Sequence, residues 1–345
     1  MKTYNVAIVG ATGAVGQKIL QLLEGSAIPI NSLKLLASKR SVGKAYEFKG
    51  KEYKIEETTK VSFENVDIAF FSAGGSITKA YQQAARDSGA VVIDNTSAFR
   101  MDADTPLVVP EVNPAALENH TGLIANPNCS TIQMVVALRP IEKSFGLSRV
   151  IVSTYQAVSG AGLSALEELE DQTKKMLAGE KVEAAILPAA SDKKHYPIAY
   201  NVLPQIDQFS DDGYTFEEWK MIHETKKILG RPDLKVSATC VRVPVIQGHS
   251  ESVYVEVDKE GVTVEEFRAV LAKADGVILQ DDPANQIYPH ALDAANKKDT
   301  FVGRVRKDPD DPKGFHLWIV SDNLIKGAAW NSVQIAEKMI EKDLI

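Results

Sequence analysis

The chain has 345 residues, a formal net charge of −7 and a pI near 5.5, and 44% of its residues are hydrophobic. This is an ordinary globular composition, and the length suits two domains. The acidic balance argues against a nucleic-acid surface or a polybasic membrane patch, and no apolar run approaches the roughly 18 residues that span a bilayer. Two distant cysteines form no disulfide framework, and the first residues do not resemble a signal peptide, so we expect a cytoplasmic protein.

The first part of the chain alternates short apolar runs with helical stretches. The patterns predict strands at 5–9, 33–37, 66–71 and 90–93, and helices at 16–23 and 77–88. Strands that alternate with helices form βαβ units around a parallel sheet. We therefore expect a Rossmann-like α/β domain over residues 1–127.

The second part has longer β-rich runs with period-two alternation. These lie at 149–155, 235–245, 252–257 and 316–320, with helices predicted at 163–177 and 264–272. This pattern predicts a second, α+β domain with a mixed or antiparallel sheet over residues 128–325. The final helix, within about 326–345, is expected to pack back on the first domain. The loop at 190–215 is a candidate for subunit contact.

A glycine loop follows the first predicted strand. Gly10, Gly13 and Gly16 form a G-x-x-G-x-x-G variant of the dinucleotide fingerprint between a strand and a helix. Glycines permit a tight turn and close approach to a pyrophosphate, and the helix N-terminus offers unpaired N–H groups. The alternative is a tight turn without a ligand.

The end of the second predicted strand bears on the choice of cofactor. An acidic residue there would hold a ribose 2′-hydroxyl and repel a 2′-phosphate. The segment Ser38-Lys39-Arg40-Ser41 is instead cationic and hydroxyl-bearing, which favours NADP over NAD. A solvated basic turn is the alternative interpretation.

One of the two cysteines stands where a helix is expected to begin. Cys129 lies in Asn126-Pro-Asn-Cys-Ser-Thr131, before an apolar run of helical length. The field at a helix N-terminus favours the thiolate, which is the nucleophilic form. Cys240, within an apolar strand, fits a small buried hydrophobe, and Cys129 could be one also.

A thiol nucleophile needs an acid/base partner, and six histidines are available. His249 is the best candidate because it follows a strand and a glycine, and the ends of strands are where α/β sites collect. His316 begins a predicted strand and is expected to be structural. Spacing alone leaves the choice open.

Four segments together resemble the aspartate-β-semialdehyde dehydrogenase family, in particular its Gram-positive bacterial type. They are GATGAVG at the N-terminus, the turn from Ser38 to Ser41, Asn-Pro-Asn-Cys-Ser-Thr, and Arg-Val-Pro-Val-Ile-Gln-Gly-His ending at His249. The resemblance covers nearly the whole chain in the same order, and the last two segments are highly specific.

The resemblance implies a role for individual residues. Cys129 would be the nucleophile, His249 the acid/base, and Gln156 the residue that orients the substrate. Substrate would be bound by Arg242 (carboxylate), Glu217 (amino group), and Arg100, Lys220 and Asn128 (phosphate). NADP would be contacted by Gly10, Thr12, Gly13, Ala14, Val15, Ser38, Arg40, Ser41, Ser72, Ala73, Gly74, Ser159, Gly160 and Asn323.

These assignments have physical support and plainer alternatives. A guanidinium fork suits a carboxylate, and Arg242 lies in an otherwise apolar strand where an unpaired charge would be costly. Glu217 and Lys220 stand three residues apart and could form a surface ion pair of a helix. Neither HExxH nor a paired CxxC occurs, so no metal is expected.

The implied function is an NADP-dependent, phosphorylating dehydrogenase that acts as a homodimer. It would reduce L-aspartyl-4-phosphate to L-aspartate 4-semialdehyde through a Cys129 thioester, for lysine, threonine, methionine and diaminopimelate biosynthesis. One alternative is N-acetyl-glutamyl-phosphate reductase, whose thiol typically sits in Pro-Gly-Cys-Tyr and whose substrate lacks a free amino group. Another is a regulatory protein that senses NADPH without turnover.

Overall fold

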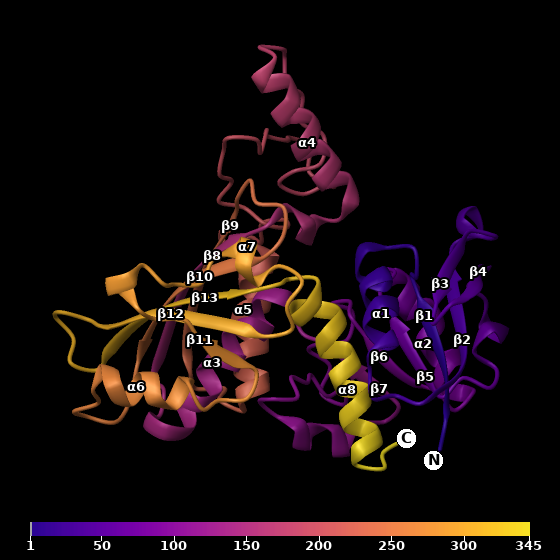
Figure 1. The fold of residues 1–345 in the computed structure, drawn as a ribbon, viewed down its shortest axis with the longest axis horizontal. Helices are drawn as coiled ribbons and strands as arrows, with labels where there is room; N and C mark the ends of the chain where they lie inside the picture. Colours follow the sequence, from indigo (N-terminus) through magenta and orange to yellow (C-terminus); the bar gives the residue numbers. More distant parts are fainter. Residues whose placement is uncertain (1) are drawn as a thin grey trace. The chain divides into compact units, whose positions relative to one another are not determined.

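The computed structural model describes residues 2–345, and the chain divides into two compact units (Figure 1). Unit 1 is Met1–Asn128 together with Ala328–Ile345, and unit 2 is Cys129–Gly327. Unit 1 is therefore built from both ends of the sequence. Within residues 2–345, no helix has the length and hydropathy needed to cross a membrane.

Unit 1 contains a seven-stranded sheet in the order β3-β4-β2-β1-β5-β6-β7. Every neighbouring pair is parallel except β3 and β4. The strands are β1 (Tyr4–Val9), β2 (Ile30–Ala37), β3 (Ala45–Phe48), β4 (Lys51–Glu57), β5 (Ile68–Phe71), β6 (Val91–Asp94) and β7 (Leu123–Ala125). The predicted Rossmann-like parallel sheet is confirmed.

Helices cover both faces of this sheet. Strand β1 sends Val6 and Ile8 into one apolar cluster, which includes α1 (Ala14–Glu24) and α8 (Trp330–Glu341). Its alternate residues belong to a second cluster with α2 (Gly75–Asp87). Burial on both faces explains why the strand is a continuous apolar run rather than an alternating one.

Unit 2 contains a six-stranded mixed sheet in the order β11-β12-β13-β10-β8-β9. Its outer pairs, β11 with β12 and β8 with β9, are parallel and the inner pairs are antiparallel. The strands are β8 (Arg149–Gln156), β9 (Lys235–Arg242), β10 (His249–Glu256), β11 (Val277–Leu279), β12 (Thr300–Lys307) and β13 (Gly314–Ser321). The predicted mixed sheet is confirmed.

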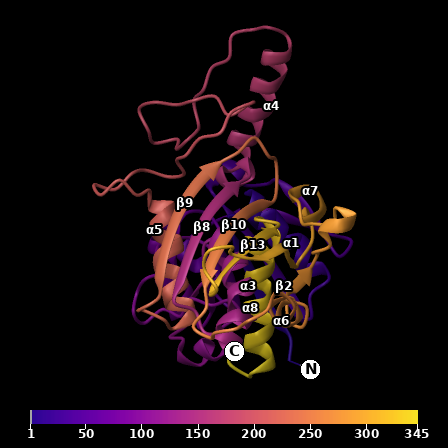
Figure 2. The ribbon, with the colours of Figure 1, turned by 90° about the vertical axis from the view of Figure 1, so that its left-hand side faces the viewer.

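One face of the second sheet is covered by helices α3 (Cys129–Phe145), α5 (Phe216–Leu229) and α6 (Val264–Leu271). In β8, Val152 and Thr154 point toward the helices and are buried, whereas Ile151 and Tyr155 alternate with them and are exposed. Figure 2 shows β9, β8, β10 and β13 side by side, in the order of the sheet. Helix α4 (Leu163–Leu177) has a separate small core, and α7 (Ala291–Ala294) is a single turn.

Several elements differ from the sequence prediction. The predicted strand at 235–245 ends at Arg242, because Pro244 has no N–H to donate and Val245 turns back to the carbonyl of Val243. His249 is the first residue of β10 rather than a residue after a strand. The hairpin of β3 and β4 and strand β12 are not predicted, and a helix at α5 is considered only as an alternative setting for Glu217 and Lys220.

We expect Gly16→Ala to destabilise unit 1 by more than about 2 kcal/mol, because overpacking here strains backbone rather than a flexible side chain. A Cβ at Gly16 would lie 2.2 Å from the carbonyl oxygen of Gly10. Gly25 ends the same helix with a negative φ and no atom within 4 Å of a built Cβ, so Gly25→Ala should change stability by less than about 0.5 kcal/mol. Urea denaturation of both variants tests this, and equal midpoints would refute it.

Candidate active site

The glycine loop of unit 1 is shaped by close backbone contacts. Gly10 has φ 87°, and a Cβ there would lie 2.9 Å from the amide nitrogen of Ala73. Gly13 precedes the first turn of α1, and no side chain caps that turn. The loop therefore presents backbone N–H groups at a helix N-terminus, as binding of a pyrophosphate requires.

A second helix begins at the same edge of the sheet. Strand β5 pairs with β1, and the segment Ser72-Ala73-Gly74 leads from it into α2. Gly74 has φ 99° and gives no side-chain cap. Strands β2 and β5 lie on opposite sides of β1 in the sheet, so the direction of the strand order reverses at β1. This edge is therefore a topological switch point, where α/β sheets bind ligands.

The basic turn after β2 lies beside the glycine loop. The backbone nitrogens of Gly10 and Ala11 both donate to the carbonyl of Leu36, one residue before the strand ends. Lys39 to Ser41 then form a 3₁₀ turn, with Lys39 and Arg40 exposed. Close glycines, uncapped helix N-termini and exposed cations fit a dinucleotide with an additional phosphate.

Cys129 is the first residue of α3 in unit 2, and it is half-buried and in no disulfide with the described residues. Most of α3 is buried, so its position is fixed by packing. Gly327 lies against the cysteine, since a Cβ at Gly327 would be 2.7 Å from the Cβ of Cys129. The helix start favours the thiolate of Cys129.

His249 is fully buried and has one ring nitrogen already bonded. The backbone N–H of Ala157 donates to Nδ1 over 2.9 Å, while Nε2 meets no partner among residues 2–345. Burial, helped by the positive charge of Arg242, lowers the pKa of His249 to about 3. The imidazole is therefore neutral, and because Nδ1 accepts, its proton is on Nε2.

Arg242 ends β9 next to His249. Its Nη1 donates to the carbonyl of Ala157 over 2.8 Å, and its Nε has no partner in the described part of the chain. Burial lowers its pKa, an effect opposed mainly by Glu217 and then by Cys129. A Cβ at Gly160 would come within 3.1 Å of Arg242 Nη1 and 3.3 Å of His249 Nε2, so a glycine keeps the space beside both groups open.

A chain of hydrogen bonds holds the acidic residue of the site. Thr154 Oγ1 donates to Gln156 Oε1 over 2.9 Å, and Gln156 Nε2 donates to Glu217 Oε1 over 3.1 Å. The other oxygen of Glu217 accepts from Lys220, which also pairs with Asp207 at 2.8 Å. Burial lowers the pKa of Lys220, but the two carboxylates outweigh it and raise the pKa overall.

Asn323 fixes the turn before the histidine. Its Oδ1 accepts from the backbone N–H of Gly248 over 2.9 Å, and its Nδ2 donates to Ser159 Oγ over 3.0 Å. In unit 1, Arg100 is similarly fixed, donating to the carbonyls of Asn95 and Asn126, each over 2.9 Å.

The structure places the residues predicted from sequence in two groups. Unit 1 contains those around the glycine loop and two of the three expected to bind phosphate: Gly10, Thr12, Gly13, Ala14, Val15, Ser38, Arg40, Ser41, Ser72, Ala73, Gly74, Arg100 and Asn128. Unit 2 contains those around the thiol: Cys129, Gln156, Ser159, Gly160, Glu217, Lys220, Arg242, His249 and Asn323.

Two features of unit 2 are absent from the sequence prediction. Gly327 contacts Cys129, and Asp207 shares the ammonium of Lys220 with Glu217. Gly327 lies in the π-helix Ile325–Ala329 that leads into α8, and nothing in the sequence links it to the cysteine. Cys240 is fully buried with its Sγ 3.7 Å from Met221 Sδ, and burial raises its pKa well above the usual range.

Two family models match the chain, one within each of the two units. The family described as semialdehyde dehydrogenase, NAD binding domain, matches residues 5–120, and the semialdehyde dehydrogenase dimerisation domain matches residues 138–326. An aspartate-semialdehyde dehydrogenase of Bacillus subtilis is 60% identical over 341 residues, and one of Aquifex aeolicus is 52% identical over 345, each covering 99% of both chains. A crystal structure of aspartate semialdehyde dehydrogenase II complexed with ASA, from Vibrio cholerae, has a TM-score of 0.93, 46% identity and 99% coverage of both chains.

The buried neutral histidine predicts a pH effect on stability. Between pH 6.5 and about 3 the unfolded chain binds a proton at His249 that the folded protein does not, so this contribution to stability falls as the pH falls. Relative to His249→Gln, the wild type should lose about 2 kcal/mol between pH 7 and pH 5. Denaturant titrations measure this, with the exposed His223→Gln as a control; parallel pH profiles of wild type and His249→Gln would contradict it.

Proposed function

The chain belongs to the aspartate-semialdehyde dehydrogenase family, and from this membership we propose that it reduces L-aspartyl-4-phosphate to L-aspartate 4-semialdehyde with NADPH. The observation that carries the proposal is the position of Cys129, at the start of a buried helix in the same unit as a neutral His249 and a buried Arg242. The relative whose crystal structure holds ASA supports this substrate.

The thiolate of Cys129 attacks the carbonyl carbon of the acyl phosphate. The tetrahedral oxyanion collapses, the C–O bond to phosphate breaks, and phosphate leaves with the bonding electrons, which gives a thioester. NADPH, when bound, supplies a hydride to the thioester carbon. The resulting alkoxide expels the thiolate and forms the aldehyde, so Cys129 returns to its starting state.

His249 serves this sequence as a hydrogen-bond donor. Its Nδ1 is occupied by the N–H of Ala157, and its Nε2–H is the group left to face an oxyanion. Neither the addition of the thiolate to the carbonyl carbon nor the collapse of the oxyanion requires transfer of a proton. A hydrogen-bond donor that stabilises the oxyanion is therefore sufficient. The sequence predicts that His249 acts as an acid/base, and we propose the more specific role of a hydrogen-bond donor through Nε2.

Arg242 and Glu217 suit the two ends of an amino acid. A guanidinium binds a carboxylate in a bidentate manner, and a carboxylate in a buried setting is a partner for an ammonium group. Glu217 is 4% exposed and is held by Gln156 and Lys220. An N-acetylated substrate has no ammonium group for Glu217 to bind. An aspartate derivative is therefore favoured over an N-acetyl-glutamate derivative.

The phosphate is assigned to Arg100, Asn128 and Lys220. Fixed positive charge stabilises a leaving dianion, and rigid placement avoids reorganisation during the reaction. Arg100 is held by two carbonyls, and Lys220 by two carboxylates. The acidic partners of Lys220 raise its pKa and so keep it protonated.

NADP is assigned to the glycine loop, the turn from Ser38 to Ser41, the Ser72 to Gly74 segment, and Ser159, Gly160 and Asn323. The absence of an acidic residue at the end of β2 removes the group that would repel a 2′-phosphate. Arg40 is exposed and free of ion pairs with the described residues, which suits a phosphate ligand. The product would serve lysine, threonine, methionine and diaminopimelate synthesis.

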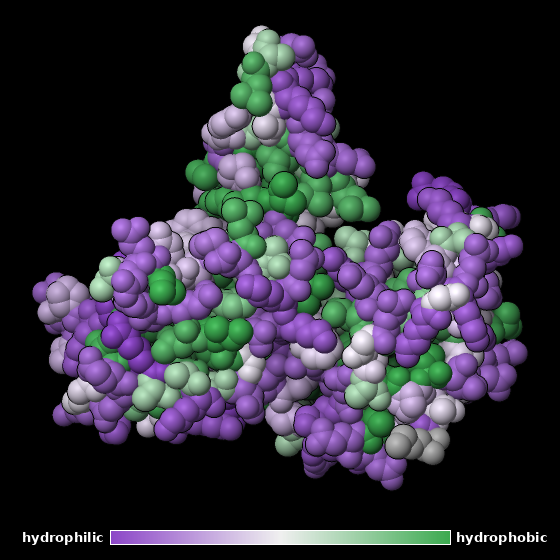
Figure 3. Space-filling view, in the orientation of Figure 1, coloured by the Kyte–Doolittle hydropathy of each residue, from purple (hydrophilic) through white to green (hydrophobic). Residues whose placement is uncertain are grey.

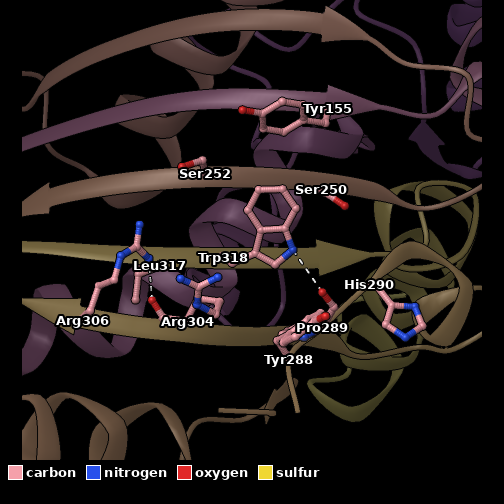
Figure 4. Close-up of a pocket in the computed structure, with 10 residues that line it drawn as sticks. All are labelled: Tyr155, Ser250, Ser252, Tyr288, Pro289, His290, Arg304, Arg306, Leu317 and Trp318. Carbon is pink, nitrogen blue, oxygen red and sulfur yellow. Dashed lines mark hydrogen bonds between the residues drawn. The ribbon is translucent and has the colours of Figure 1, made fainter. Parts of the chain in front are cut away.

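A homodimer is the expected assembly, and unit 2 has surfaces suited to it. Its matching family is described as a dimerisation domain. The uncovered face of the sheet carries a pocket lined by Tyr155, Tyr288, Arg304 and Trp318, among others (Figure 4). Apolar side chains also gather at the base of the α4 segment (Figure 3). Aromatic and arginine side chains are the ones enriched at interfaces.

The decisive assay is NADPH formation from aspartate semialdehyde, NADP and phosphate. Cys129→Ala should lower turnover by at least about 10⁴-fold, because the covalent route is lost. Cys240→Ala, which removes the other thiol, should keep phosphate-dependent turnover. Wild-type enzyme that rejects this substrate but accepts N-acetyl-glutamate semialdehyde would identify the other reductase, and rejection of both would leave a nucleotide-binding protein.

Arg40→Ala tests the cofactor assignment. Loss of a charge-assisted bond worth about 1.5–3 kcal/mol should raise the KM for NADP by roughly 10-fold or more and leave the KM for NAD unchanged. Lys44→Ala, an exposed cation four residues further on, is the matched control. An unaltered NADP/NAD preference in Arg40→Ala would refute binding of the 2′-phosphate by this residue.

A further inference from the structure

A buried acid lies two residues beyond His249 on the same face of β10. Glu251 is 0% exposed, and the alternation of the strand turns it toward the helices, as it does His249. Its neighbours across the sheet are Thr154 on β8 and Ile319 on β13. No step of the proposed reaction uses it.

Gln133 is a polar neighbour of Glu251, and its side-chain oxygen also lacks a hydrogen-bond donor among residues 2–345. Gln133 lies one turn after Cys129 in α3, is also fully buried, and donates from Nε2 to the carbonyl of His249 over 3.3 Å. Its Oε1 and both carboxyl oxygens of Glu251 lack a donor in hydrogen-bonding geometry among residues 2–345. Burial of three acceptors without a donor is unfavourable.

A proton on the carboxyl group allows two of these three atoms to pair with each other. An ionised carboxylate and an amide oxygen only accept, whereas a neutral carboxylic acid carries one O–H donor. Burial raises the pKa of Glu251 well above its usual range, and the polar side chain of Gln133 lowers it by less. The hydroxyl proton of Thr154 is already committed to Gln156, and Cys240, beside Thr154 on β9, is a weak donor.

We propose that the carboxylic acid of Glu251 donates its hydrogen to Oε1 of Gln133 and so locks the strand that begins at His249 against the helix that begins at Cys129. The bond fixes the orientation of the Gln133 amide, which directs Nε2 to the His249 carbonyl. Glu251 is thus a positioning residue for the pair. This inference rests on the proposed roles of Cys129 and His249.

Three single variants and one double variant separate this role from the alternatives. Glu251→Gln keeps a neutral donor of the same shape, so its kcat should stay within about 3-fold of wild type. Glu251→Met removes the donor at similar volume and should lower kcat about 10-fold with little change in KM, because a small misplacement of reacting groups slows chemistry. Gln133→Met should match it, and the double variant should be no worse than either.

Glu256→Gln, on the same strand but paired with Arg149 at the surface, is the control. If Glu251→Gln were as impaired as Glu251→Met, the group would act as an ionised carboxylate and the proposal would fail. It would also fail if Glu251→Met kept full activity, because packing alone would then be sufficient.

Infrared spectroscopy gives a result independent of activity and of the proposed reaction. The wild type at pH 8 should show the carbonyl band of one neutral carboxylic acid that is missing from Glu251→Gln and present in Glu256→Gln. Absence of this band from the wild type would overturn the inference even if the enzyme turned over its expected substrate.

Discussion

The hydrogen bond from the Ala157 amide to Nδ1 of His249 is the contact on which the chemistry of unit 2 depends. It decides which imidazole nitrogen carries the proton and turns that proton toward the unpaired side of the ring. The carbonyl of Ala157 accepts a hydrogen bond from Arg242, so one residue orients both the imidazole and the guanidinium. Because both are buried, water does not compete for either.

The polar groups around this segment form short chains that each end on backbone or on an opposite charge. Glu217 is shared by Gln156 and Lys220, and Asn323 joins Ser159 to Gly248. Buried polar groups cost little when they are bonded in this way, and they restrict side chains to one arrangement. The site is therefore organised before substrate arrives, as stabilisation of an oxyanion requires.

The sequence predicts what local patterns specify. The glycine loop and the start of α3 can be recognised because turn geometry and helix starts depend on neighbouring residues. The hairpin of β3 and β4 escapes prediction because β4 has a single buried residue, Ile55, and so lacks an apolar run. Gln133 and Glu251, 118 positions apart by their numbers, are brought together only by packing of α3 on the sheet.

Because α8 closes the apolar cluster of unit 1, the order of synthesis leaves that unit incomplete until α8 has been made. Val333, Ala336 and Met339 cover the same core as Ile19 and Leu23, yet some three hundred positions separate them. Unit 2 is continuous and can collapse as soon as it emerges. A nascent or truncated chain thus exposes an incomplete hydrophobic surface, which marks such chains for chaperones and proteases.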